Sequence, residues 1–317
     1  RSLVRLLGMD AGFDTTHLLT LEINSTGASY PNDSSVFNYH DRVREAVGAL
    51  PGVTSVAVAN QLPLGGNLDM YGVVDVANVP DNPELAPSGD RYAVSTDYFH
   101  TMRIPILAGR AFTASDAAEG ASKVALVSEA LARRLWPAGN PIGQRIRVGG
   151  VDAPARTIIG VAGNVRHTGL DAKTTLQWYI PERQMFFADN QEVLMVRTAG
   201  DPGSLAPAVH RAIAAIDPAQ PIVKIATMEE VVATSTSQRR LALVLFGAFA
   251  AAALLLAVAG IYGVLAGSVS ERTREIGLRS ALGATPGSLI GLVVGQGGRL
   301  AALGIVLWLA GTFALTR

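Results

Sequence analysis

One stretch of this sequence restricts its fold more than any other, because thirty consecutive residues, 241–270, carry no charged side chain. The stretch is rich in Leu, Ala, Val, Phe and Gly. As an α-helix it would reach about 45 Å, which exceeds the hydrocarbon core of a bilayer at roughly 30 Å. The alternative is a buried helix of a soluble protein, but such helices rarely lack a polar face at this length. The sequence therefore predicts a transmembrane helix over residues 241–268.

A second apolar run covers residues 289–316 and is interrupted by Gln296 and Arg299. An arginine is costly at the bilayer midplane, so we expect Arg299 to lie near a headgroup region. We therefore predict a further transmembrane helix that begins near residue 289 and is cut at the end of the given sequence.

Glycines recur at a four-residue spacing within and beside these runs. The spacing puts them on one face of a helix, where the missing side chain lets two helix backbones approach closely in lipid. The alternative is the general enrichment of glycine in membrane helices. The predicted helix-packing residues are Gly263, Gly267, Gly283, Gly287, Gly291 and Gly295.

A charged segment, residues 271–284, separates the two apolar runs. Glu271 with Glu275, and Glu275 with Arg279, stand four residues apart, and apolar residues are interspersed among them. The pattern predicts a short amphipathic helix at a membrane surface. Its three arginines favour the cytoplasmic side, although two further arginines precede the first apolar run and weaken that argument.

Residues from about 16 to 236 have the mixed composition of a soluble body. Runs of β-branched and alternating residues predict strands, and helical patterns separate them, which indicates an α/β or α+β fold. Residues 6–238 hold 24 Asp and Glu against 17 Lys and Arg, so the body lacks the basic excess of a nucleic-acid-binding domain. The predicted strands are 18–23, 53–59, 123–127, 144–148, 157–161, 192–197 and 222–226, and the predicted helices are 36–50, one ending near 135, and 204–216.

The sequence offers no arrangement of residues for catalysis, cofactor binding or metal binding. It contains no cysteine, which excludes disulfides, thiolate zinc sites and cysteine nucleophiles. None of its five histidines has another three to five residues later, so no sequence-local zinc site is predicted. The G-x-x-x-x-G-K-[ST] loop that cradles ATP phosphates is absent, so we expect this chain not to be an ATPase and not to be an enzyme.

The order of these parts, and several short motifs, resemble a known family. The chain resembles the permease of MacB/FtsX-type ABC transporters, in particular the duplicated permeases whose ATPase is encoded separately. The motifs that carry the resemblance are Glu271-Arg-Thr-Arg-Glu-Ile-Gly-Leu-Arg279 and Ala281-Leu-Gly-Ala284 in the membrane part, and Gly12-Phe-Asp14, Leu50-Pro-Gly-Val53, Leu62-Pro-Leu64 and Asn140-Pro-Ile-Gly143 in the body.

The resemblance implies a division of the chain. Residues 1–9 would end a preceding transmembrane helix, and residues 10–236 would form a MacB-like periplasmic core domain with a second subdomain inserted at about 96–188. Residues 237–317 would be an FtsX-like permease domain, truncated before a fourth helix. The protein would then be a multi-pass protein of the bacterial inner membrane, with its main domain in the periplasm.

The resemblance also implies a function, in which ATP hydrolysis by a separate ATPase changes the periplasmic conformation and drives export or efflux. The implied partners are that ABC ATPase, membrane lipid, a second permease unit in a dimer or pseudo-dimer, and a periplasmic adaptor. Two alternatives are a signalling protein that acts on a partner such as a cell-wall hydrolase, and a membrane-anchored enzyme. The implied ATPase-coupling residues are Glu271, Arg272, Arg274, Glu275 and Arg279.

Overall fold

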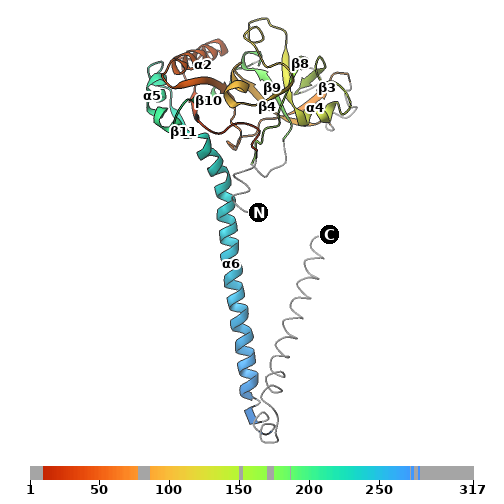
Figure 1. The fold of residues 1–317 in the computed structure, drawn as a ribbon, viewed down its shortest axis with the longest axis vertical. Coiled ribbons are helices and arrows are strands. Elements are labelled where there is room, and N and C mark those ends of the chain that lie inside the picture. The colour runs from red at the N-terminus through yellow and green to blue at the C-terminus, as the bar shows by residue number, and fades with distance from the viewer. Residues whose placement is uncertain are drawn as a thin grey trace. The chain divides into compact units, whose positions relative to one another are not determined.

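The computed structural model describes residues 10–77, 86–149, 153–169, 175–185 and 187–271, together with 273, 274 and 278. The chain divides into two units, residues 1–238 and residues 239–317. The first unit, called the body below, contains all eleven strands described (Figure 1). This mixed α/β architecture confirms the predicted fold class.

The elements of the body alternate along the chain. The strands are β1 (Leu18–Asn24), β2 (Val53–Ala59), β3 (Met70–Asp75), β4 (Ser88–Val94), β5 (Ile106–Gly109), β6 (Val124–Ser128), β7 (Arg145–Val148), β8 (Arg156–Ala162), β9 (Gln177–Pro181), β10 (Gln191–Thr198) and β11 (Ile222–Thr227). The helices are α2 (Asp33–Gly48), α3 (Tyr98–Met102), α4 (Glu129–Leu135), the 3₁₀ turn η2 (Glu182–Gln184) and α5 (Pro202–Ala214), and α6 (Met228–Glu271) begins at the end of β11.

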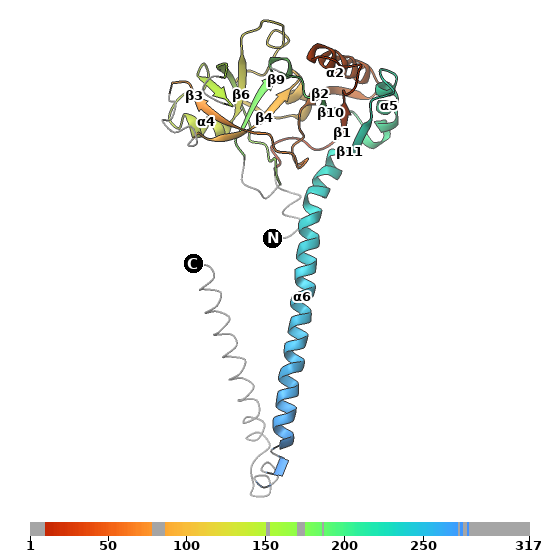
Figure 2. The same cartoon turned by 180° about the vertical axis from the view of Figure 1, so that it is seen from behind.

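Four strands form an open part of the sheet in the order β11-β1-β10-β2, and their neighbouring pairs are antiparallel. Alternate residues of a strand point to opposite faces. Leu19, Leu21 and Ile23 of β1 accordingly pack on one face with side chains of α2 and α5. Figure 2 shows both helices beside this part of the sheet.

The strands from β3 to β9, apart from β5, close into a ring. β4 pairs with β3, β3 with β7, β7 with β8, β8 with β6 and β6 with β9, and β9 returns to pair in parallel with β4. Ala59 of β2 and Val94 of β4 form the pair that joins the ring to the open sheet. The predicted insertion at about 96–188 stays a prediction, and the ring also contains β3 and β4, which precede residue 96.

A shared apolar core holds the ring and the open sheet together. It contains Ala57 and Met195 from the open sheet, and Tyr92 and Tyr179 from the ring. The same core buries Met228, the first residue of α6, while Val231 and Val232 pack against it. Burying one such side chain stabilises a fold by about 1.5–3 kcal/mol, so the start of α6 is fixed within the body.

Asp116 organises the loop between β5 and β6. Its carboxylate accepts two hydrogen bonds from Arg110, at 2.6 and 2.9 Å, and two from Thr113, at 2.8 and 2.7 Å. The bond from Arg110 is the main reason that the pKa of Asp116 falls from 3.8 to about 2. A lowered pKa in the folded state stabilises the protein above the unfolded value, and this stabilisation is lost as the pH falls through about 2.

The substitution Asp116→Asn is therefore expected to lower the free energy of unfolding at pH 7 by about 1–2 kcal/mol, a value reduced by solvent screening because Arg110 is half exposed. The difference from wild type should shrink between pH 4 and pH 2. Urea titrations of the full chain in detergent, followed by tryptophan fluorescence, measure it. Glu119→Gln changes an exposed carboxylate of the same loop and should show neither effect.

Candidate functional site

The longest element described is α6, which runs without a break for 44 residues. It starts at a capping box, since the Thr227 amide donates to the Glu230 carboxylate at 2.8 Å and the Glu230 amide donates to the Thr227 hydroxyl at 3.2 Å. At 1.5 Å per residue the helix is about 66 Å long, which is well over twice the roughly 30 Å of a bilayer core.

Within α6, Val244–Val264 is the one segment of the described residues long and apolar enough to cross a membrane. Large apolar side chains are exposed all along it, among them Phe246, Phe249, Leu255 and Tyr262. A helix whose large apolar side chains are exposed on every side among the described residues fits a lipid environment. The segment lies inside the predicted span 241–268.

The predicted helix-packing glycines fall in two groups. Gly263 and Gly267 lie on α6, and apart from the backbone of the helix itself no described atom comes within 4 Å of a Cβ built on either of them. No described residue covers their surface, and their packing role stays a prediction. The other four, Gly283, Gly287, Gly291 and Gly295, lie outside the described residues, as does the predicted helix from 289.

The predicted ATPase-coupling residues follow α6 directly. Glu271 is its last residue, and Arg274 is also helical. The Thr273 hydroxyl donates to the Ser270 carbonyl at 2.8 Å. Arg272, Glu275 and Arg279 lie outside the described residues, so the coupling role of all five stays a prediction.

Arg197 fixes the N-terminal segment of the body against the sheet. This buried side chain of β10 donates to three backbone carbonyls, those of Asp14, Thr16 and Thr101, at 2.5–2.8 Å. Its guanidinium also lies 3.6 Å from the Asp14 carboxylate. The role of Arg197 could not be predicted from the sequence, because a lone arginine in an apolar strand does not reveal its partners. The residues leading into β1 are thus held by a strand of the open sheet.

A cavity of about 400 Å³ lies where α6 leaves the body. Its walls come from β1, β10, β11, the loop 62–67 and the first two turns of α6, and they include Leu62, Val193 and Val231. An ion pair of 2.6 Å between Lys224 and Glu22 joins two of the lining residues. The cavity is therefore largely apolar with a few charged groups.

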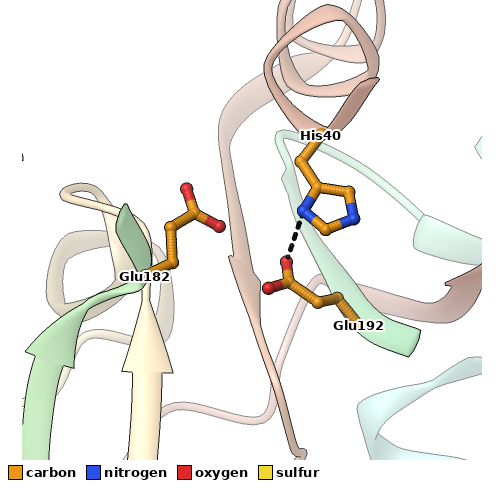
Figure 3. Close-up of side chains that lie close together, drawn as sticks. All are labelled: His40, Glu182 and Glu192. Carbon is orange, nitrogen blue, oxygen red and sulfur yellow. Dashed lines mark ion pairs between the residues drawn. The ribbon is translucent and has the colours of Figure 1, made fainter. Parts of the chain in front are cut away.

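His40, Glu182 and Glu192 form a buried polar cluster that the sequence did not predict (Figure 3). They come from α2, η2 and β10, and their candidate ligand atoms all lie within 4.8 Å of one another. His40 Nδ1 lies 3.3 Å from a Glu192 oxygen. No local spacing could reveal this cluster, because the three residues meet only through the tertiary fold.

Burial dominates the electrostatics of this cluster. It lowers the pKa of His40 to about 4, so the imidazole is neutral at pH 7. It raises the pKa of Glu182 and, more strongly, that of Glu192, and the nearby Glu182 carboxyl raises the pKa of Glu192 further. Two carboxyl groups at this distance cannot both stay ionised without a cation or a shared proton.

Comparison with known proteins identifies the family. Residues 8–216 match the MacB-like periplasmic core domain, and residues 247–317 match the FtsX-like permease C-terminal region. The first match alone covers more than half of the chain. The two matched regions follow each other in the order that the motifs predicted.

Three curated relatives are similar over parts of their length. The uncharacterized ABC transporter permease YknZ of Bacillus subtilis is 28% identical over 62% of this chain and 49% of its own. The pyoverdine export ATP-binding/permease protein PvdT of Pseudomonas aeruginosa is 27% identical over a region that makes up 82% of this chain and 37% of PvdT. The macrolide export ATP-binding/permease protein MacB of Agrobacterium fabrum is 31% identical over a region that makes up 67% of this chain and 34% of MacB. The chain thus spans between about a third and a half of these relatives.

Two solved structures are similar at 13% sequence identity. The periplasmic region of MacB from Actinobacillus actinomycetemcomitans has a TM-score of 0.47 and covers 73% of this chain and 97% of its own. The extracellular domain of the noncanonic ABC-type transporter YknZ from Gram-positive bacteria has a TM-score of 0.44. The match covers 65% of this chain and 100% of the YknZ domain. The family assignment rests on the two domain matches: the chain belongs to the MacB/FtsX-type permease family, with a MacB-like periplasmic core domain followed by an FtsX-like permease region.

Proposed function

We propose that this chain is the permease subunit of an ABC exporter and transmits the ATP-driven movement of a separate ATPase to its periplasmic body. The observation that carries the proposal is the continuity of α6. Its first residue, Met228, is buried in the core of the body, and its last, Glu271, begins the charged segment 271–284. A continuous helix is stiff, so a displacement at one end reaches the other.

The names of the relatives support this reading. PvdT and MacB are named as export proteins that combine an ATP-binding part with a permease part, and YknZ is named as a permease. The name of YknZ mentions a permease alone, and we propose that in this protein too the ATPase is a separate chain. The body would lie in the periplasm and the segment 271–284 in the cytoplasm. A permease dimer, an adaptor and lipid contacts remain predictions of the same proposal.

The test is co-purification of the intact permease with its candidate ATPase. In the variant Glu275→Arg with Arg279→Glu, the pair keeps its four-residue spacing but presents inverted charges to a partner. We expect wild type to retain the ATPase, and this variant to lose it or to lose stimulation of ATP hydrolysis.

The matched control is Glu129→Arg with Arg133→Glu, which inverts an ion pair of the same spacing on α4 of the body. This control should bind the ATPase as wild type does. Retention of a fully stimulated ATPase by the Glu275 and Arg279 variant would contradict the coupling role. If no ATPase binds to wild type, the exporter proposal fails and the signalling alternative takes its place.

A further inference from the structure

The buried cluster of His40, Glu182 and Glu192 lacks the hydrogen bonds that its atoms need. Within the described residues, both ring nitrogens of His40 and one oxygen of each glutamate are buried without a hydrogen bond, although His40 Nδ1 approaches a Glu192 oxygen at 3.3 Å. His40 and Glu192 are at most 1% exposed. A buried polar group without a partner costs about 1–3 kcal/mol, and a charged one more. Four such atoms at one point call for a ligand that satisfies them together.

The neighbouring arginines only partly compensate the two carboxylates. Asp41 accepts hydrogen bonds from both Arg44 and Arg183, so the two cations share one anion outside the cluster. Arg44 also acts electrostatically on Glu182. Arg44, Arg183 and Asp41 together carry one positive charge, whereas Glu182 and Glu192 carry two negative charges when both are ionised. If both glutamates were ionised, one buried negative charge would remain uncompensated unless a cation were bound.

We propose that His40, Glu182 and Glu192 bind one divalent transition-metal ion of the zinc class. One imidazole nitrogen and two carboxylate oxygens are a ligand set that such ions accept, with bonds of about 2.0–2.2 Å. The ligand atoms already lie within 4.8 Å of one another, so closing on an ion needs only a small inward movement. The ion would cancel both carboxylate charges and use the lone pair of the neutral imidazole.

The position of the cluster assigns the ion a structural role. His40 lies on α2 above the open sheet, Glu192 on β10 of that sheet, and Glu182 directly after β9 of the ring. An ion held by all three would cross-link the ring to the open sheet on the side of α2. It would stiffen the body independently of whether the protein transports anything, so this inference does not rest on the proposed function.

The test uses the full chain, without a histidine tag, purified in detergent with a chelator and then dialysed. Titration with ZnCl₂ by calorimetry should show one ion bound per chain, and thermal unfolding should shift to a higher temperature with Zn²⁺. Glu192→Gln, which keeps the shape of the side chain, should weaken binding at least about 10-fold and abolish the thermal shift. Co²⁺ in place of Zn²⁺ should give a visible absorption band in wild type and not in the variant.

Glu22→Gln is the matched control. Glu22 is a buried glutamate on β1, and it pairs with Val193 while its neighbour Ile23 pairs with Glu192, so it points to the opposite face of the same sheet. This variant should bind Zn²⁺ as wild type does. If wild type shows neither binding nor a thermal shift, the cluster shares a proton and the proposal is overturned. Equal binding by Glu192→Gln would overturn it as well, because the ion would then lie elsewhere.

Discussion

A chain with Leu254→Arg and Leu255→Arg is expected not to pass α6 across the bilayer. Both side chains are exposed and lie near the middle of the span Val244–Val264. Each arginine at the centre of a transmembrane helix costs about 2.5–3.5 kcal/mol by insertion scales, so the pair costs about 5–7 kcal/mol. Two adjacent charges near the middle of the span also leave too few apolar residues on either side for the helix to slide past them.

Single-cysteine labelling measures the outcome, because these 317 residues contain no cysteine. One reporter, Ala28→Cys, lies on an exposed part of the body, and the other, Leu278→Cys, follows α6 and is also exposed. With α6 across the membrane, an impermeant maleimide added outside spheroplasts should label residue 28 and not residue 278. With the two arginines present, both should be labelled.

Leu254→Ala with Leu255→Ala is the control for the same positions. It removes side-chain volume but keeps the helix apolar, so residue 278 should stay protected. Two results would refute the assignment of α6 as a span: labelling of residue 278 in the wild-type background, or its continued protection in the arginine variant.

Strands with a regular apolar pattern could be located from the sequence. The predictions 53–59 and 18–23 agree with β2 and β1, and 157–161 lies within β8. The strand β4 was missed, because it carries the buried charged residues Asp90 and Arg91, and Arg91 is paired with Asp69 and Asp189 through tertiary contacts that no sequence pattern shows. Closure of the ring depends on β4 pairing with β9, so its topology could not be predicted either.

Some features of the candidate sites could be predicted from the sequence, and others depend on tertiary contacts. The span in α6 follows from composition alone, and the capping box of Thr227 and Glu230 was a local signal that the sequence contained. The cluster of His40, Glu182 and Glu192 and the contacts of Arg197 join residues that are far apart in the chain. Such sites depend on which strands and helices the fold brings together, so a single sequence leaves them hidden.

Replacing Arg197 with Met is expected to lower the free energy of unfolding of the body by about 3–5 kcal/mol. Methionine fills a similar volume but cannot donate to the carbonyls of Asp14, Thr16 and Thr101. Hydrogen bonds from a charged group contribute about 1.5–3 kcal/mol each, and these are not additive, because the acceptors share one guanidinium. The loss should also release residues 10–17 from the sheet, since Arg197 connects them to β10.

Arg103→Met is the matched control, because Arg103 also pairs with Asp14, at 2.6 Å, but its side chain is 61% exposed. Exposed ion pairs contribute about 0–1 kcal/mol, so this variant should unfold almost as wild type does. Urea titration with tryptophan fluorescence measures both, and hydrogen exchange of residues 10–17 separates local release from global loss of stability. Equal, small effects of the two substitutions would mean that the N-terminal segment is held by its apolar contacts. A large effect of Arg197→Met alone would make Arg197 the link that fixes this segment to the sheet on which α6 also begins.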